Sequence, residues 1–258
     1  MGERSSYTPG TFCWVDLTTA DQDGAKAFYT ALFGWEVDDR PIGDGVVYST
    51  MLVDGKQVGA ISPQPQSQRD AGAPAAWNSY VAVADADAVA ARAAELGGTL
   101  HAPPFDVFDA GRMAAIRDPQ GAYFAIWQPN EHNGAQLVNA PGAFSWNELA
   151  SPDIDGSAAF YGELFGWNLT AMEGMPMRYL VIANGERSNG AITELTPPAP
   201  PHWLVYFAVA DIDAGLATLA ELGGSKIAGP IDIGIAKIAV VADPQGTVFA
   251  LYAGQLED

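Results

Sequence analysis

The sequence predicts an α+β fold built from four βαβββ modules, two in each half of the chain. Three observations predict it. The chain repeats itself in tandem, each half runs twice through the order strand, helix and three strands, and the composition is that of a globular protein. With 258 residues, 48% of them hydrophobic and 17% charged, the chain can bury the core of one large domain or two ordinary ones.

The tandem repeat is visible in three aligned blocks. Residues 12–35 match residues 144–167 at an offset of 132, with 13 of 24 positions identical. Residues 77–98 match 203–224 with 14 of 22 identities, and residues 118–126 match 243–251 with 6 of 9. Such agreement indicates an internal duplication, which decides the whole fold.

The first module begins with an alternating segment rich in aromatic and β-branched residues, Phe12–Thr18, which predicts a strand. Asp21 can cap a helix that ends at Gly34. Asp54-Gly55 is a strong hairpin signal between two further strands. The three predicted strands that follow the helix are Gly34–Asp38, Val46–Val53 and Gln57–Ser62.

The second module repeats this order. A strand over Asn78–Ala84 precedes a helix that Asp85 caps and Gly97-Gly98 ends. Strands follow at Thr99–Pro103, Arg112–Arg117 and Ala122–Gln128. The halves differ in length only after Trp35 and around Gln64–Pro74, and both stretches are predicted to be loops.

The segment 129–141 is rich in Asn, Gly and Pro and predicts a linker between the halves. We therefore expect one domain at residues 1–128 and a second at 142–258.

Charge and composition exclude several classes of function. Lys and Arg number 12 against 31 Asp and Glu, and the formal charge of -19 would repel nucleic acids and anionic membrane surfaces. The longest apolar runs are far shorter than the ~20 residues of a membrane span. A single cysteine, Cys13, excludes an intramolecular disulfide. The start of the sequence shows no apolar signal core, so a cytoplasmic location is expected.

Several motifs resemble a known superfamily. FYTALFGW and FYGELFGW follow a strand, VADADA and VADIDA open helices that close with ELGG, and DPQG precedes each last strand. Together they resemble the vicinal oxygen chelate superfamily of glyoxalases, bleomycin-resistance proteins and extradiol dioxygenases. The tandem form with WVDL, WNEL and VYFAVAD is similar to two-domain actinobacterial proteins labelled hydroxylase or antigen. The resemblance implies two cupped, mostly antiparallel barrels of eight strands, each around a cavity.

Metal-using members of that superfamily place His and Glu ligands on the first and last strands of their modules. The corresponding positions of this sequence lack good ligands, because indole, methyl and isobutyl groups do not bind metal. We therefore expect no metal and no cofactor. The eight positions are Trp14, Ala60, Asn78 and Ala125 in the first half and Trp146, Ala191, Leu204 and Ala250 in the second.

The cavity walls are predicted to be aromatic, because strand alternation places these side chains on the inward face. Such walls suit a flat apolar or aromatic molecule, although each aromatic residue could also fill a core that has lost its site. Arg112 and Lys237 stand at corresponding positions near each mouth and could hold an anion or pair with surface acids. The aromatic and polar lining candidates are Trp14, Trp146, Asn78, Tyr80, Tyr206, Tyr123, Trp127 and Tyr252.

Three residues are candidates for acid-base chemistry. Asp16 and Glu148 each follow a tryptophan by two positions on the inward face, where burial would raise the pKa of a carboxyl. Glu148 is favoured because His202 occurs only in its half and could complete a pair. Both acids and His202 could equally be ordinary strand-end residues. His101 and His132 are expected to be structural or exposed to solvent, and the turns at Asp118 and Asp243 are assigned no chemistry.

Three functions remain open. The favoured one is binding of a hydrophobic or aromatic small molecule without metal, as in the bleomycin-resistance branch. The alternative is a metal-independent hydroxylase-, lyase- or isomerase-like enzyme acting on an aromatic or polyketide-like metabolite through Glu148 and His202. A metal-dependent glyoxalase or dioxygenase is least favoured. The sequence leaves open which modules pair, and a monomer or homodimer is expected.

Overall fold

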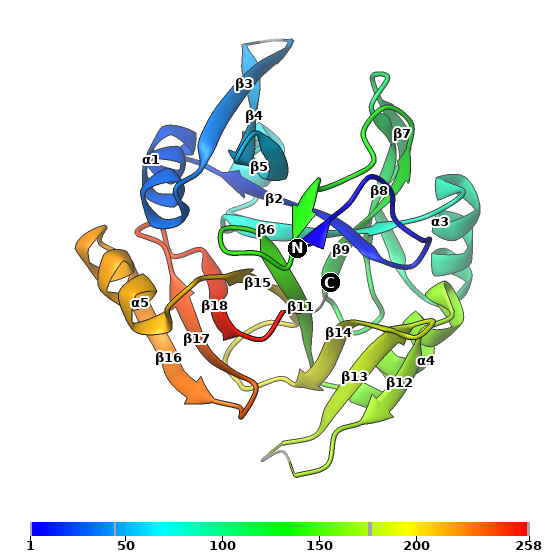
Figure 1. Cartoon of the computed structure of the whole chain (residues 1–258). Helices are drawn as coiled ribbons and strands as arrows, with labels where there is room; N and C mark the ends of the chain where they lie inside the picture. Colours follow the sequence, from blue (N-terminus) through cyan, green and yellow to red (C-terminus); the bar gives the residue numbers. More distant parts are fainter. Residues whose placement is uncertain (1, 44, 175–176, 257–258) are drawn as a thin grey trace.

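The computed structural model describes residues 2–43, 45–174 and 177–256, and it contains one eight-stranded sheet for each half of the chain (Figure 1). Both sheets are mixed, and the first curls into a half-barrel. The first sheet contains β2 (Phe12–Thr19), β3 (Glu36–Gly43), β4 (Val46–Val53), β5 (Lys56–Pro63), β6 (Ala76–Ala82), β7 (Thr99–Val107), β8 (Gly111–Arg117) and β9 (Tyr123–Pro129). The second contains β11 (Phe144–Ser151), β12 (Asn168–Ala171), β13 (Tyr179–Asn184), β14 (Arg187–Glu194), β15 (His202–Ala208), β16 (Ser225–Asp232), β17 (Ala236–Ala242) and β18 (Val248–Gly254).

The strand order shows which modules pair. It is β3-β4-β5-β2-β6-β9-β8-β7 in the first sheet and β12-β13-β14-β11-β15-β18-β17-β16 in the second. The first strands of two successive modules meet antiparallel at the centre, β2 on β6 and β11 on β15. Each of these strands also pairs parallel with the last strand of its own module. The modules therefore pair within each half, and the predicted α+β fold with four βαβββ modules is confirmed.

Each module contributes one helix, and the predicted caps are present. These helices are α1 (Gln22–Phe33), α3 (Ala86–Glu95), α4 (Ile154–Phe165) and α5 (Ile212–Glu221). Asp21 accepts a hydrogen bond from the Gly24 amide and Asp85 from the Ala88 amide, so both act as N-caps. Gly34 ends α1 with a φ of 71°, which a residue with a Cβ adopts only at a cost.

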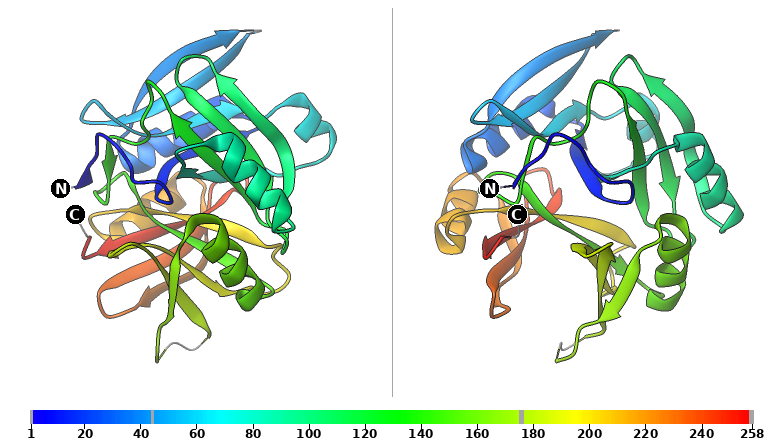
Figure 2. Two further views of the ribbon diagram at one scale, coloured as in Figure 1. Left: turned by 90° about the vertical axis from the view of Figure 1, so that its right-hand side faces the viewer. Right: turned by 45° about the vertical axis from the view of Figure 1, so that its right-hand side comes forward.

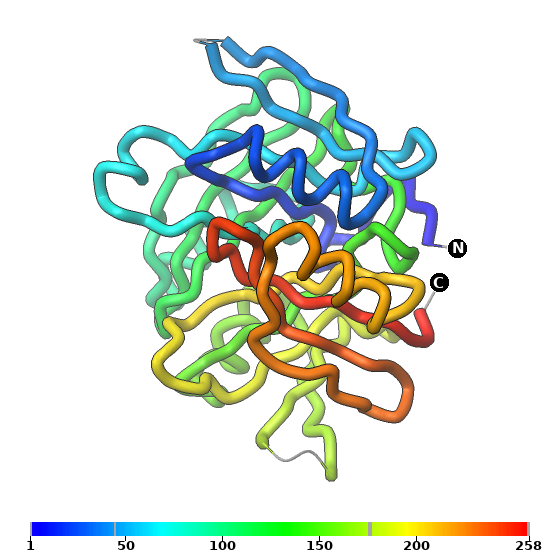
Figure 3. The backbone as a smooth tube through the Cα atoms, turned by 90° about the vertical axis from the view of Figure 1, so that its left-hand side faces the viewer, coloured from blue at the N-terminus to red at the C-terminus, as the bar shows by residue number. Residues whose placement is uncertain are grey.

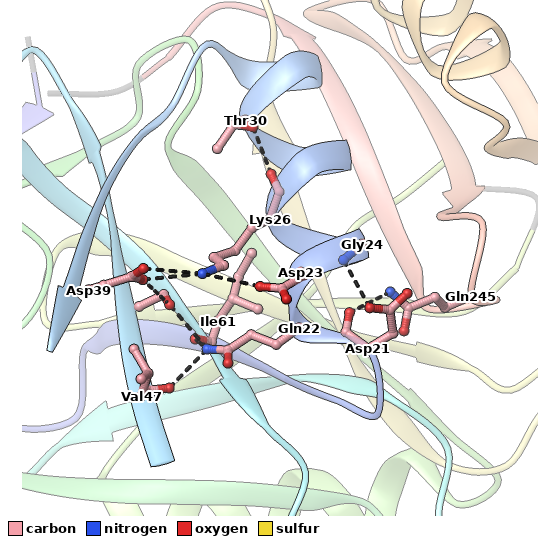
Figure 4. A network of polar contacts seen from close by, with 11 residues as sticks. Asp21, Gln22, Asp23, Gly24, Lys26, Thr30, Asp39, Val47, Ile61 and Gln245 are labelled. Atoms are coloured by element: carbon pink, nitrogen blue, oxygen red, sulfur yellow. Dashed lines mark hydrogen bonds and ion pairs between the residues drawn. The ribbon is translucent and has the colours of Figure 1, made fainter. Parts of the chain in front are cut away.

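The start of α1 is fixed by its first side chain (Figure 4). The Gln22 amide nitrogen donates to the Val47 and Ile61 carbonyls, both at 2.9 Å, and so ties the helix to β4 and β5. Gln245, from the second half, donates to the Asp21 carbonyl at 2.9 Å. The helix is thus held by both halves of the chain.

Two stretches predicted as loops contain regular structure. After Trp35, β3 extends the strand predicted at Gly34–Asp38 as far as Gly43, into the stretch predicted as a loop, and it pairs with β4. The segment 64–74 contains the short helix α2 (Gln66–Asp70). The prediction of a loop was wrong there because five residues are too few for a periodic apolar pattern to show.

The two halves pack closely, with α1 beside α5 on one side and α3 beside α4 on the other (Figures 1 and 3). Aromatic rings fill the space between them. Phe207 lies 4.8 Å from Trp77 and 5.6 Å from Trp35, measured between ring centroids. The predicted linker contains β10 (Leu137–Val138), which pairs with β1 (Gly2–Glu3) near the N-terminus (Figure 2).

The exact domain boundaries at 128 and 142 remain predictions. Among the described residues, no helix is long and apolar enough to span a bilayer.

Candidate functional site

The site candidates lie on one face of each sheet, which we call the first cup (the face with Trp14, Asp16 and Tyr80) and the second cup (the face with Trp146, Glu148 and Tyr206). In the second cup, Leu204, Tyr206 and Ala250 form an apolar cluster with Trp146 that is separate from the main core. Residues of opposite parity on the same strand, such as Trp203, belong to the main core. The two faces are thus packed separately on β15, whereas in the first half Trp14, Tyr80 and Ala125 belong to the main core together with Trp77.

The centre of the first cup is the carboxylate of Asp16, which is 5% exposed. It accepts hydrogen bonds from the Asn78 amide at 2.9 Å and from the Tyr80 hydroxyl at 2.9 Å. The Tyr48 hydroxyl lies 3.3 Å from the same carboxylate and itself accepts a 2.9 Å bond from the Trp14 indole. The predicted residues Trp14, Asp16, Asn78 and Tyr80 are thus brought together by one hydrogen-bonded network.

The two tyrosine hydroxyls of this network stay protonated. Burial raises the pKa of Asp16, although the three hydrogen bonds that it accepts act in the opposite direction. The pKa values of Tyr48 and Tyr80 are raised well above their usual value by burial and then by the charge of Asp16. Both hydroxyls therefore remain donors at neutral pH.

The second cup repeats the arrangement with two differences, Glu148 in place of Asp16 and Leu204 in place of Asn78. Burial raises the pKa of Glu148, and hydrogen bonds from Tyr179 and Tyr206 lower it. The Trp146 indole donates to the Tyr179 hydroxyl at 3.3 Å. Glu148 pairs across the sheet with Leu204, where Asp16 pairs with Asn78. The second acid therefore lacks the amide donor of the first.

The two cups differ in access. Trp14 and Asp16 are each 5% exposed, whereas Trp146 and Glu148 are only partly buried. Access to solvent is what a small molecule needs, so the second cup is the better candidate for binding.

The first cup is covered by residues 131–136 of the predicted linker, which we call the strap. The imidazole of His132 lies 4.5 Å from the Trp14 ring and 5.7 Å from the Trp127 ring, measured between centroids. The Trp127 indole donates to the His132 carbonyl at 2.8 Å. His132 is therefore packed against the aromatic wall, which agrees with the structural one of the two roles expected for it.

A groove of about 880 Å³ lies over the strap at the mouth of the first cup, which is a volume typical of small-molecule sites. Acidic and basic side chains line it in equal number, and Phe108 stands at its edge, 72% exposed. The lining residues are Glu3, Arg4, Ser5, Arg40, Lys56, Gln57, Phe108, Asp109, Ala110, Glu131, His132, Asn133, Gly134 and Gln136.

The remaining aromatic candidates lie at the ends of the cups. Tyr123 is 51% exposed, and its ring packs edge-on against His101 at 5.3 Å. Tyr252 pairs with Ile238 in the second sheet, and its hydroxyl donates to the Gln255 carbonyl at 2.5 Å. Both share the face of the cup, so their contact with a ligand stays a prediction.

The two cationic candidates pair with acids on the helices. Arg112 forms hydrogen bonds of 2.7 and 2.9 Å with Asp87 of α3 and one of 2.8 Å with Asp106. Lys237 lies 4.0 Å from Asp213 of α5. Both cations therefore pair with surface acids, which is one of the two roles expected for them. An anion-binding role stays a prediction.

His202 begins β15, and its Nδ1 lies 2.8 Å from the Pro200 carbonyl oxygen. It pairs across the sheet with Ala150, one pair beyond Leu149–Trp203 and two beyond Glu148–Leu204. The described hydrogen bonds of Glu148 come from tyrosines, so a pair of Glu148 with His202 stays a prediction.

Sequence reasoning missed Tyr48, Tyr179 and the place of His132. The two tyrosines lie on β4 and β13 and hold the same position relative to the acid and the indole. They correspond at an offset of 131, one less than that of the first aligned block, so an alignment that crossed the hairpins would have paired them. Nothing in the sequence around His132 indicates a contact with Trp14, 118 positions away.

The chain matches the family model of the Glyoxalase/Bleomycin resistance protein/Dioxygenase superfamily twice, over residues 11–126 and 143–251. The chain belongs to this superfamily. Its two matched repeats coincide with the two sheets, so the superfamily fold occurs once in each half.

Two groups of superfamily relatives cover almost the whole chain. "Putative glyoxylase CFP32" of Mycobacterium tuberculosis is 46% identical over 255 residues, which is 97% of each protein. "Anthracycline biosynthesis protein DnrV" of Streptomyces peucetius is 34% identical over 260 residues, covering 95% of this chain and 94% of the relative.

Solved structures of superfamily members agree in fold. The Mn(II)-bound glyoxalase from Novosphingobium aromaticivorans has a TM-score of 0.66 at 18% identity, covering 100% of this chain and 84% of that one. The 2,3-dioxygenase LapB from Pseudomonas sp. KL28 has a TM-score of 0.66 at 14% identity, covering 98% and 96%. At such low identity, these likenesses show the fold alone.

The metal of such superfamily members does not fit the residues present here. Each cup offers one carboxylate, and its neighbours on the adjoining strands are Ala60 and Asn78 in one half and Ala191 and Leu204 in the other. A divalent transition metal needs three or four converging donors. No group of three or more His, Cys, Asp or Glu residues with suitable geometry occurs in the described parts of the chain.

Proposed function

We propose that the second cup binds a flat aromatic small molecule of the polyketide type without a metal. The observation that carries this proposal is the partly accessible group of Trp146, Glu148 and Tyr179, which lies with the buried Tyr206 on one face of the sheet. An indole beside a carboxyl with two hydroxyl partners can stack on a planar ring and form hydrogen bonds with its carbonyl or hydroxyl groups.

The walls around this group are apolar. Val240, Ile238 and Tyr252 pack, like Trp146, against the buried cluster of the second cup, so a ligand would bury its rings against them. Glu148 would supply the polar contact that fixes the orientation of the ligand, because a site built to form a hydrogen bond discriminates more strongly than apolar contact does.

The names of two relatives support this class of ligand. Proteins that are 34% identical over 95% of this chain are named for anthracycline biosynthesis, and anthracyclines are planar aromatic polyketides. The other relatives carry a glyoxylase name, and the donor sets of both cups argue against a metal-dependent reaction here.

The test is a titration of the protein with quinizarin, a neutral dihydroxyanthraquinone, followed by tryptophan quenching. A neutral probe is chosen because a probe that carries a cationic amino sugar would be attracted without specificity to a chain with a formal charge of -19. We expect saturable quenching that Trp146→Ala weakens at least tenfold in Kd, with quinizarin recovered unchanged. The matched change Trp14→Phe, in the covered cup, should leave the affinity within twofold. Equal effects of the two changes would contradict the assignment to the second cup.

A second candidate function is metal-independent acid-base catalysis. It is favoured by the raised pKa of Glu148, which poises a carboxyl for proton transfer. If the protein turns over an aromatic metabolite, Glu148→Gln should lower kcat by about 100-fold or more while quinizarin still binds. His202→Ala should lower kcat as well if the predicted pair forms, and turnover that survives both changes would exclude this mechanism.

A further inference from the structure

We infer that the first cup is a second site for the same class of flat aromatic molecule, and that the side chain of His132 occupies it in the resting protein. The inference rests on the proposed function for the ligand class only. Its geometric basis is the insertion of one ring from the strap between two tryptophans of the cup.

His132 contacts both tryptophans with the ring edge-on to their planes. The imidazole stands at 85° to the Trp14 ring and at 71° to the Trp127 ring, which is the edge-to-face geometry that aromatic pairs favour. Burial lowers the pKa of His132 to about 4, and the nearby charge of Arg40 adds to this effect. The ring is therefore neutral at pH 7 and behaves as a planar aromatic guest.

The strap is held in place by backbone contacts rather than by the histidine alone. The Ala135 amide donates to the Cys13 carbonyl at 2.8 Å, and the Tyr7 hydroxyl donates to the Ala135 carbonyl at 2.6 Å. The Gln136 amide donates to the Gln57 carbonyl at 2.7 Å. Removal of the imidazole should therefore empty the space beside Trp14 without releasing the strap.

The two cups share the rest of their chemistry. Each has an indole that donates to a tyrosine, and that tyrosine is a hydrogen-bond partner of the acid. Beside Trp14 lies the additional ring of His132, 4.5 Å away between centroids, and Trp14 is buried whereas Trp146 is partly exposed. The strap, through His132, thus covers the first cup, whereas the second cup is accessible.

The space above His132 can hold the remainder of a ligand. His132 itself lines the groove of about 880 Å³, which also contains Arg40 and the exposed ring of Phe108. A three-ring molecule could place one edge beside Trp14, where the imidazole now lies, and its other rings in the groove.

The experiment counts quinizarin sites by isothermal titration in the full chain and its variants. We expect His132→Ala to bind one molecule more than the unchanged protein. His132→Phe, which refills the space with a ring, should return the number to that of the unchanged protein. His101→Ala is the matched control, because it removes a histidine that packs edge-on against Tyr123 in the same half, and it should change nothing.

The added site must depend on Trp14. In the His132→Ala background, Trp14→Ala should abolish it, and Trp14→Phe, which keeps a ring for folding, should weaken it at least fivefold. An unchanged site count in His132→Ala, or an added site that survives both Trp14 changes, overturns the inference.

The outcome also separates this inference from the proposed function. If the unchanged protein binds no quinizarin and His132→Ala binds one molecule through Trp14, the first cup is a site and the proposal for the second cup fails. If the unchanged protein binds one molecule through Trp146 and His132→Ala adds none, only the present inference fails.

Discussion

The hydroxyl of Tyr161, in the second half, donates a 2.9 Å hydrogen bond to the carboxylate of Asp118 in the first half. The duplication repeats the contact in reverse, with the Tyr29 hydroxyl 3.1 Å from Asp243. The same carboxylates accept backbone amides of their own DPQG and following residues. These turns therefore join the two halves, which gives the repeated motif a structural role.

Tyr161→Phe should destabilise the protein by about 1 to 3 kcal/mol, because it leaves the buried Asp118 and the Trp203 indole each without one partner. Urea unfolding measures the loss. Tyr123→Phe changes a half-exposed tyrosine and should cost less than about 0.5 kcal/mol. Equal losses in the two variants would show that the contact between the halves adds nothing to stability.

Gly134→Ala should loosen the strap. The residue has a φ of 112°, and a Cβ there would lie 2.5 Å from the Cys13 carbonyl oxygen and 3.1 Å from its Cβ. Cys13 is fully buried, and burial raises the pKa of its thiol, so alkylation by iodoacetamide should be slow in the native protein. We expect the variant to react at least tenfold faster. Gly166→Ala, at a φ of 72° with nothing within 4 Å, is the control, and it should react at the rate of the unchanged protein.

Asp16→Asn should change how stability depends on pH. Burial raises the pKa of Asp16 in the folded state, so the folded protein holds this proton more tightly than the unfolded chain does. The contribution of Asp16 is therefore full below the unfolded pKa of about 4 and is lost as pH rises through the raised folded value. The free energy of unfolding of Asp16→Asn, minus that of the unchanged protein, should increase between pH 4 and 7. A constant difference would rule out the raised pKa.

His132 should make the free energy of unfolding depend on pH in the opposite direction. Its pKa of about 4 in the folded state lies below the unfolded value of about 6.5, so its contribution is present above pH 6.5 and is lost as pH falls toward 4. We expect the unchanged protein to lose on the order of 1 to 3 kcal/mol relative to His132→Gln over this interval. Parallel stability curves would contradict this. The charged side chains that line the groove with His132 are Glu3, Arg4, Arg40, Lys56, Asp109 and Glu131.

Much of the site follows from strand alternation. Trp14 and Asp16 are two positions apart on one strand, and Tyr80 follows Asn78 by the same spacing, so local periodicity alone places them on common faces. Tyr48 and Tyr179 escaped prediction because they come from the hairpins, where the two halves differ in length and the repeat loses its register. The hydrogen bond between Trp14 and Tyr48 joins β2 to β4, which are separated by β5 in the sheet. It therefore depends on the curl of the sheet, which brings β4 toward the face of β2 (Figure 1).

The duplication, the four modules, the helix caps and the strand alternation can all be predicted from the amino-acid sequence, because the repeat shows in aligned segments and the other features depend on residues close together in the chain. The pairing of modules within each half, the contact of Tyr161 with Asp118 and the closure of the first cup by His132 become visible only in the folded chain. Those contacts join residues far apart in the sequence. They depend on how whole sheets pack and curl, and no periodicity along the chain encodes that geometry.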